Sequence, residues 1–205
     1  MVHGIMEVVR EMRDANIRWI VMGDDDSIFF VENMIDVLRG FDHRKYYYIG
    51  GQSEFILSYP LAKALASDME NCLRRYTQFF TSDTHTMYCI ADIGVNLTPL
   101  KGFHQIDLRG DLSGLLSSHP KFPLLSLHHI DLVEPIFPGM EHQQSIRHLM
   151  EAATADQSCM LQQTICYNRE SNWSVSISWG YSDRLWIAYR TKSTRDCVES
   201  KKLEP

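Results

Sequence analysis

The chain has 205 residues, of which 44% are hydrophobic, so it can bury one sizeable core and one domain is the expected count. Its formal net charge of −6, with no cluster of basic residues, argues against a groove that follows the phosphates of a nucleic acid. No charged-then-apolar leader is present, and no apolar run approaches the roughly 20 residues that cross a bilayer. We therefore expect a soluble α/β domain that does not bind nucleic acid.

The first elements follow from apolar spacing. Helical spacing predicts a helix near the start, and residues 17–22 read as a β-strand that ends at Gly23. A second helical stripe follows, and Gly40 stands where a left-handed cap would end that helix. The first helix carries Ile5, Val8, Val9 and Met12, and the second carries Val31, Met34, Ile35 and Leu38.

Three consecutive carboxylates, Asp24, Asp25 and Asp26, lie between that strand and the second helix. Each pair of like charges costs about 1 kcal/mol in water at about 4 Å, and a bound cation reverses the sign. Oxygen ligands suit a hard divalent ion such as Mg²⁺ or Mn²⁺, and ligands bind at the carboxyl ends of strands in open α/β sheets. The alternative is a solvated turn in which Asp26 or Ser27 caps the helix. Three acids exceed what a cap needs, which favours a metal site.

The middle of the chain predicts two short strands and two helices. Residues 46–49 and 55–57 read as strands joined by a turn at Gly50 and Gly51. A helix begins at residues 58–60, with a proline near its first position. Its predicted buried side consists of Leu61, Leu65, Met69, Cys72 and Tyr76.

The next helix begins near Asp83, capped by Ser82 or by Asp83 itself, and ends at Gly94. We expect Met87, Ile90 and Ala91 to face inward. A carboxylate at a helix N-terminus stays ionised and could accept a proton from a hydroxyl group. A plain cap explains Asp83 equally well, so both readings stay open.

Further along, residues 102–107 read as a loop that leads into a strand, and residues 111–116 as a short helical turn. Residues 124–131 form an apolar strand that ends in His128 and His129. Neighbouring residues on a strand point to opposite faces, so only one of these histidines should look into a site. His104 reads as a hydrogen-bonded loop histidine.

The last third changes from helix to strand. Ile146, Leu149, Met150 and Ala153 mark a helix, and residues 160–167 and 173–179 predict a hairpin or small antiparallel sheet. Residues 182–205 read as a charged tail whose end we expect to be disordered.

The five cysteines lack the short paired spacing of a zinc site. If the chain is lumenal, Cys72 with Cys89 and Cys159 with Cys166 are the natural pairs, which leaves Cys197 over. Reduced buried thiols are the alternative. Asn96 and Asn172 begin N-glycosylation triplets, which favour a lumenal location only weakly.

Three blocks in order, WIVMGDDDSIFF, GFHQIDLRGDLSGLL and SLHHIDLVEPIFP, resemble the plant Fringe-related proteins, β-1,3-glycosyltransferase-like chains catalogued as a domain of unknown function. The resemblance covers about residues 16–179. It implies a GT-A-like nucleotide-diphospho-sugar transferase fold, with a mixed sheet flanked by helices, truncated at the N-terminus. Residues 1–155 would be the C-terminal half of that domain, 156–181 a β-rich extension, and 182–205 a divergent tail. Relatives are Golgi enzymes anchored by an N-terminal membrane helix, which implies a Golgi-lumenal location.

The resemblance also implies roles for residues. Asp26 and His129, with His128 as its rival, would hold a divalent cation, and an imidazole ligand favours Mn²⁺ over Mg²⁺. Asp24 and Asp25 would orient the ribose or the waters of the metal. Asp83 would be the catalytic base, in a place where relatives carry two adjacent acids and this chain has Asp83 and Thr84.

The family pattern also has a longer insert, ending in a glycine run near the sugar donor, where this chain passes directly from GGQSE to FILSYPLAKAL. Gly50 and Gly51 are what this chain retains of the glycine run. The implied function is metal-dependent, inverting transfer of a sugar from a UDP-sugar to a glycan hydroxyl. The alternatives are a non-catalytic remnant that binds a glycan or a protein, and a metal-dependent phosphoryl-transfer enzyme, which would need a second acidic cluster.

Overall fold

The computed structural model describes residues 2–12, 16–51, 54–79, 81–105, 123–137, 139–155 and 157, and four later strands. The chain forms two compact units. The first contains Met1–Phe29, Ile35–Gln105 and Ser126–His128, and the second contains Phe30–Met34, Ile106–Leu125 and His129–Pro205. The predicted helical turn at 111–116, Cys159, Asn172 and the end of the tail lie outside the described residues.

The first unit holds most of the described elements. Its helices are α1 (Val2–Glu11), α3 (Tyr59–Arg75), α4 (Ser82–Asp92) and the second half of α2 (Val31–Leu38). Its strands are β1 (Trp19–Met22), β2 (Ser27–Phe29), β3 (Tyr48–Gly50), β4 (Phe55–Ser58), β5 (Leu97–Pro99), β6 (Phe103–Gln105) and β7 (Ser126–His128). No described helix combines the length and the apolar character that a membrane span requires.

The strands of the first unit form two mixed sheets. In the first sheet the order is β1-β4-β3-β5, with β4 antiparallel to both neighbours and β3 parallel to β5. In the second the order is β2-β7-β6, with β7 antiparallel to β2 and parallel to β6. The prediction of an α/β fold with a mixed sheet is therefore confirmed.

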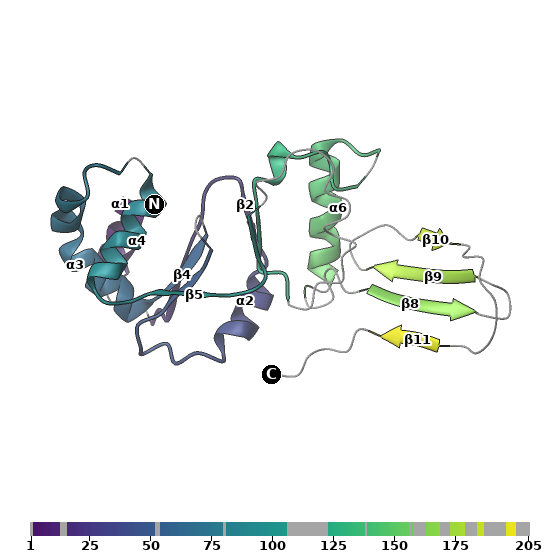
Figure 1. The fold of residues 1–205 in the computed structure, drawn as a ribbon, viewed down its shortest axis with the longest axis horizontal. Coiled ribbons are helices and arrows are strands. Elements are labelled where there is room, and N and C mark those ends of the chain that lie inside the picture. Colours follow the sequence, from purple (N-terminus) through teal and green to yellow (C-terminus); the bar gives the residue numbers. More distant parts are fainter. Residues whose placement is uncertain are drawn as a thin grey trace. The chain divides into compact units, whose positions relative to one another are not determined.

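The core of the first unit lies between the first sheet and its helices. Helices α1, α3 and α4 gather on one side of the sheet that contains β4 and β5 (Figure 1). Side chains from these helices and from β1, β3 and β4 form one buried cluster. All four residues of β4 are buried, as expected of a central strand covered on both faces. The predicted apolar stripe of α3 is buried except for Tyr76, which is half-buried.

Several local predictions are wrong. A strand, β2, follows the acidic turn before helix α2 begins, because residues 27–29 pair with β7, a partner that local spacing cannot reveal. Gly40 is not in the left-handed region, since α2 ends at Leu38 and a Gly40 N–H to Val37 C=O bond of 3.1 Å closes the turn.

Two helices are also rotated from their predicted faces. Helix α4 buries Thr86, Cys89 and Ile90, whereas Met87 and Ala91 are exposed. In α2, Met34 and Leu38 are buried, whereas Val31 and Ile35 are about half exposed. The cap of α4 is Thr81, so Ser82 and Asp83 lie in the first turn.

The second unit contains a short 3-10 helix η1 (Ile130–Leu132), helix α6 (His142–Ala155) and a sheet in the order β10-β9-β8-β11. Its strands are β8 (Gln163–Asn168), β9 (Trp173–Ser178), β10 (Arg184–Trp186) and β11 (Asp196–Glu199). All neighbouring strands are antiparallel, so the predicted small antiparallel sheet is confirmed. Strands β10 and β11 lie within the segment that we had predicted to be a charged tail.

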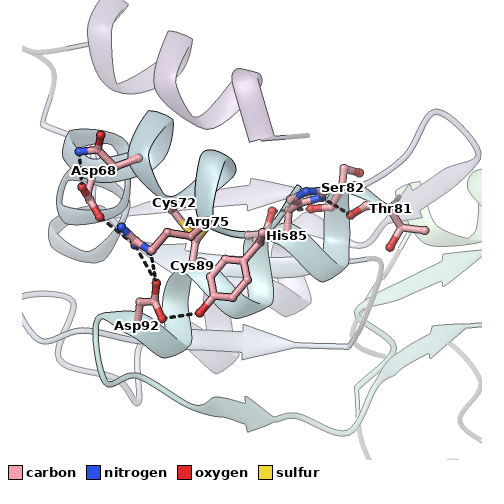
Figure 2. The surroundings of a disulfide bond; sticks show 11 residues. Asp68, Cys72, Arg75, Thr81, Ser82, His85, Cys89 and Asp92 are labelled. Atoms are coloured by element: carbon pink, nitrogen blue, oxygen red, sulfur yellow. Dashed lines mark hydrogen bonds and ion pairs between the residues drawn. A yellow bond between two sulfur atoms is a disulfide. The ribbon is translucent and has the colours of Figure 1, made fainter. Parts of the chain in front are cut away.

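Helices α3 and α4 are linked covalently by a disulfide between Cys72 and Cys89 (Figure 2). This bond confirms one of the two expected pairs. Beside it, Arg75 donates hydrogen bonds to Asp92 at 2.7 and 3.1 Å and to Asp68 at 3.0 Å. The ion pairs are partly exposed and contribute little, so the buried disulfide is the stronger of these links between the two helices.

We predict that replacing Cys72 and Cys89 together by alanine lowers the free energy of unfolding by about 3 kcal/mol, the entropy of closing a loop of this size in the unfolded chain. Urea unfolding of the native and double-variant proteins measures the change. Non-reducing peptide mapping should find the two cysteine peptides joined in the native protein. Separate peptides would contradict the assignment.

Candidate metal centre

The acidic triplet forms a tight turn between β1 and β2. The Asp24 N–H donates to Ser27 Oγ, and the Ser27 N–H donates to Asp24 C=O, both at 3.2 Å. Asp24 and Asp25 are exposed, whereas the side chain of Asp26 is only 24% exposed. This turn therefore points one of the three carboxylates, that of Asp26, toward the protein.

Strand pairing brings that carboxylate to a histidine far away in the sequence. In the antiparallel β2–β7 register, Ser27 lies opposite His128, so Asp26 reaches the end of β7. Asp26 Oδ1 lies 3.1 Å from His128 Nε2, and Asp24 Oδ2 lies 4.0 Å from the same nitrogen. His128 is buried, with 2% of its surface exposed. A buried imidazole thus faces the protein-facing acid of the triplet.

His129 adds a third potential ligand. Its φ of 61° is left-handed, which is uncommon for a residue other than glycine and clusters at functional sites. Asp26, His128 and His129 each offer a ligand atom, and these atoms all lie within 4.8 Å of one another. The expectation that only one histidine could face the site is wrong, because β7 ends at His128 and strand alternation does not continue into a left-handed residue.

The ligand set fits a divalent transition-metal ion. Ligand atoms about 2.1 Å from one ion lie at most about 4.2 Å apart, so the 4.8 Å group needs shifts of a few tenths of an ångström. One carboxylate and two imidazoles suit Mn²⁺ or a similar ion better than Mg²⁺, which prefers oxygen. Within the described part of the chain, this group has no fourth acidic or histidine ligand, so open positions would remain for water or substrate oxygens.

The other predicted site residues lie elsewhere. Gly50 has φ of +135°, and a Cβ there would meet Glu54 C=O at 2.6 Å, so this glycine is required by the tight turn from β3 to β4. The Gly51 N–H donates to the same carbonyl at 2.8 Å. Among described residues, Asp83 is not part of the metal-ligand group. It lies in the first turn of α4, where its charge acts on Tyr48.

His104, which the sequence predicts as a loop residue, lies in β6. Burial lowers the pKa of His104, so its neutral form is favoured. It is not part of the metal-ligand group of the described residues.

Glu54 is a site residue that sequence reasoning missed. It is 4% exposed, directly precedes β4, and accepts a hydrogen bond at Oε2 from the hydroxyl of Ser126 in β7. Burial raises the pKa of Glu54, and Asp26 adds to this, whereas the Ser126 and Ser27 hydroxyls and the His128 ring oppose it. The available signal was an acid next to a strand that is apolar on both faces.

Two family models match the chain. A model described as Fringe-like matches residues 2–81, which include the acidic triplet and relate the chain to glycosyltransferases. A model described as protein of unknown function, DUF604, matches residues 42–200, and the chain belongs to this family. The DUF604 match includes both histidines and extends to residue 200, beyond the resemblance seen over about residues 16–179. No curated protein matches the chain.

A pH experiment tests the position of Asp83. Burial, with the charge of Asp83, raises the pKa of Tyr48 to about 12, above the value of about 10 for an unfolded chain. The folded state thus holds the phenolic proton more tightly, so stability is unaffected below about pH 10 and falls as the pH rises toward 12.

We predict that Tyr48→Phe removes about 2–3 kcal/mol of this alkaline loss, since one pKa unit corresponds to about 1.4 kcal/mol. Asp83→Asn should lower the pH at which Tyr48 ionises. Urea unfolding between about pH 9 and 12 measures both effects, with Tyr46→Phe, which removes an exposed phenol, as the control. An unchanged slope in Tyr48→Phe would contradict the assignment.

Proposed function

We propose that the chain is a Fringe-like glycosyltransferase domain of GT-A type that transfers a sugar from a UDP-sugar to a glycan hydroxyl with inversion. The observation that carries this proposal is the group of ligand atoms from Asp26, His128 and His129, all within 4.8 Å. The Fringe-like match, which implies a sugar donor and a glycan acceptor, supports the reaction class. Residues 1–155 would form the C-terminal half of the transferase domain.

The acidic turn would bind the donor. Asp26 with His128 and His129 would hold Mn²⁺ or another divalent cation, which offsets the negative charge that develops on the departing UDP. Asp24 and Asp25 are exposed beside this group, where they would orient the ribose or the waters of the metal. Gly50 and Gly51 would let the backbone approach the donor sugar.

Asp83 would act as the general base. It lies in the first turn of α4, near the positive end of the helix dipole. The base would accept the proton of the acceptor hydroxyl as its oxygen attacks the sugar carbon opposite UDP, which gives inversion.

The Golgi lumen is the proposed compartment. The Cys72–Cys89 disulfide fits an oxidising environment, and Asn96, which begins a glycosylation triplet, is exposed. The resemblance to the Fringe-related proteins implies the same compartment. A phosphoryl-transfer enzyme is less favoured because the described residues contain one group of potential metal ligands and no second such group.

One observation favours a second function, a non-catalytic module that binds a glycan or a protein. The β3–β4 turn is short and closed by the Gly51 to Glu54 hydrogen bond, where the family pattern carries a glycine-rich insert. Such a module would keep the fold without transferring sugar. Assays of binding and of transfer therefore need to be separate.

The metal site is tested by thermal unfolding with Mn²⁺ and UDP, alone and together. We predict that the two ligands together raise the melting temperature more than the sum of each alone, and that Asp26→Asn abolishes the extra gain. Ligand at about 100 times its dissociation constant stabilises by about 2.7 kcal/mol, which is measurable.

Asp36→Asn is the matched control, because it makes the same change on the exposed face of α2. It should respond like the native protein. An equal gain in Asp26→Asn and native protein would exclude Asp26 as a ligand. No gain in the native protein would remove the basis of the transferase proposal.

The base is tested by the rate of sugar transfer to glycan acceptors. We predict that Asp83→Asn lowers kcat by about 10²–10⁴, the usual contribution of a general base. The gain from Mn²⁺ and UDP should persist, since Asp83 is outside the ligand group. Asp68→Asn, an exposed acid of α3, is the control. Ligand binding without any transfer by the native protein would favour the non-catalytic module.

A further inference from the structure

Glu54 is a buried acid, so interactions within the protein must compensate for the lost hydration of its carboxyl group. Only 4% of its surface is exposed, and carboxylates are seldom buried unless they are paired. Ser126 Oγ donates to Oε2, while Oε1 is buried with no hydrogen-bond partner in the described part of the chain. Leaving such an oxygen unsatisfied costs about 1–3 kcal/mol. The position therefore calls for an explanation beyond packing.

The groups that act on Glu54 belong to the candidate metal centre. Ser126 and His128 lie in β7, Ser27 begins β2, and Asp26 directly precedes it. Glu54 itself precedes β4, a strand of the other sheet of the same unit. One carboxylate thus interacts with β7, which carries His128, and with β2, which Asp26 directly precedes, and connects both strands to the core sheet.

We propose that Glu54 is a positioning residue of the cation site. Through Ser126 it fixes β7 beside β2, and this holds the His128 ring against Asp26. When ionised, its carboxylate would add to the attraction of the site for a cation. The inference rests on the proposed function, because it requires that the group binds a metal ion.

A purely structural role of Glu54 predicts a different result. Glu54→Gln keeps the size of the side chain and an acceptor for Ser126 but removes the charge, so a structural role would survive it. Glu54→Asp keeps the charge on a shorter arm. Ser126→Ala keeps the carboxylate and removes its anchor.

Calorimetric titration of the full chain with Mn²⁺ separates these roles. We expect Glu54→Gln to weaken Mn²⁺ binding about tenfold, at the lower end of the range for residues that orient metal ligands. Glu54→Asp should bind more tightly than Glu54→Gln, and Ser126→Ala should also bind more weakly than native protein. Glu70→Gln, which removes an exposed charge on α3, is the matched control and should bind like native protein.

A second readout needs no metal. In ¹⁵N-histidine-labelled protein, Glu54→Gln and Ser126→Ala should both shift the ring nitrogen resonances of His128, and Glu70→Gln should not. If Glu54→Gln does not fold, Ser126→Ala decides the question by both measurements.

The outcomes separate the two proposals. Native-like Mn²⁺ affinity in Glu54→Gln, together with loss of binding in Asp26→Asn, would overturn the role of Glu54 and leave the metal site intact. Absence of Mn²⁺ binding in the native protein would overturn both.

Discussion

The candidate site depends on the pairing of β2 with β7. These strands have three residues each, and their antiparallel register places Ser27 opposite His128. The acidic turn immediately precedes β2, so the register alone brings Asp26 to the imidazole. A slip of one residue would turn every side chain of the strand to the other face and separate the pair. The candidate site thus rests on a short ladder between segments that are distant in the sequence.

Local patterns were enough to predict a long helix whose apolar spacing repeats over several turns. The stripe of α3 repeats over four turns, and its predicted residues Leu61, Leu65, Met69 and Cys72 are all buried. The weaker pattern of α4 was right only for Ile90, because its polar Thr86 is buried beside Cys89 while Met87 is exposed. The helical period of α4 was evident in the sequence. The disulfide and the packing on α3 determine which face of this helix is buried.

The ligand candidates could be predicted in part. The acidic triplet stands out in composition, but the sequence does not say that Asp26 alone is turned inward, because this depends on the turn closed by Asp24 and Ser27. Strand alternation predicted that only one of His128 and His129 would face the site, and this rule fails where the backbone becomes left-handed at His129. The acid at position 54 beside an apolar strand was visible in the sequence, but its link to the site was not, since its partner Ser126 is far away in the chain. Local periodicity carries no information about contacts between segments that are distant in the sequence.

The β3–β4 turn links these features to the question of activity. Gly50 tolerates a backbone that other residues rarely adopt, and the Gly51 N–H closes the turn on the carbonyl of Glu54. The same turn fixes where Glu54 enters β4, and therefore where its carboxylate meets Ser126. In the family pattern this segment carries a glycine-rich insert for the sugar donor. Here it brings Glu54 to Ser126 beside the candidate ligand group, so under the proposed function the support of that group and the approach to the donor would compete for the same few residues.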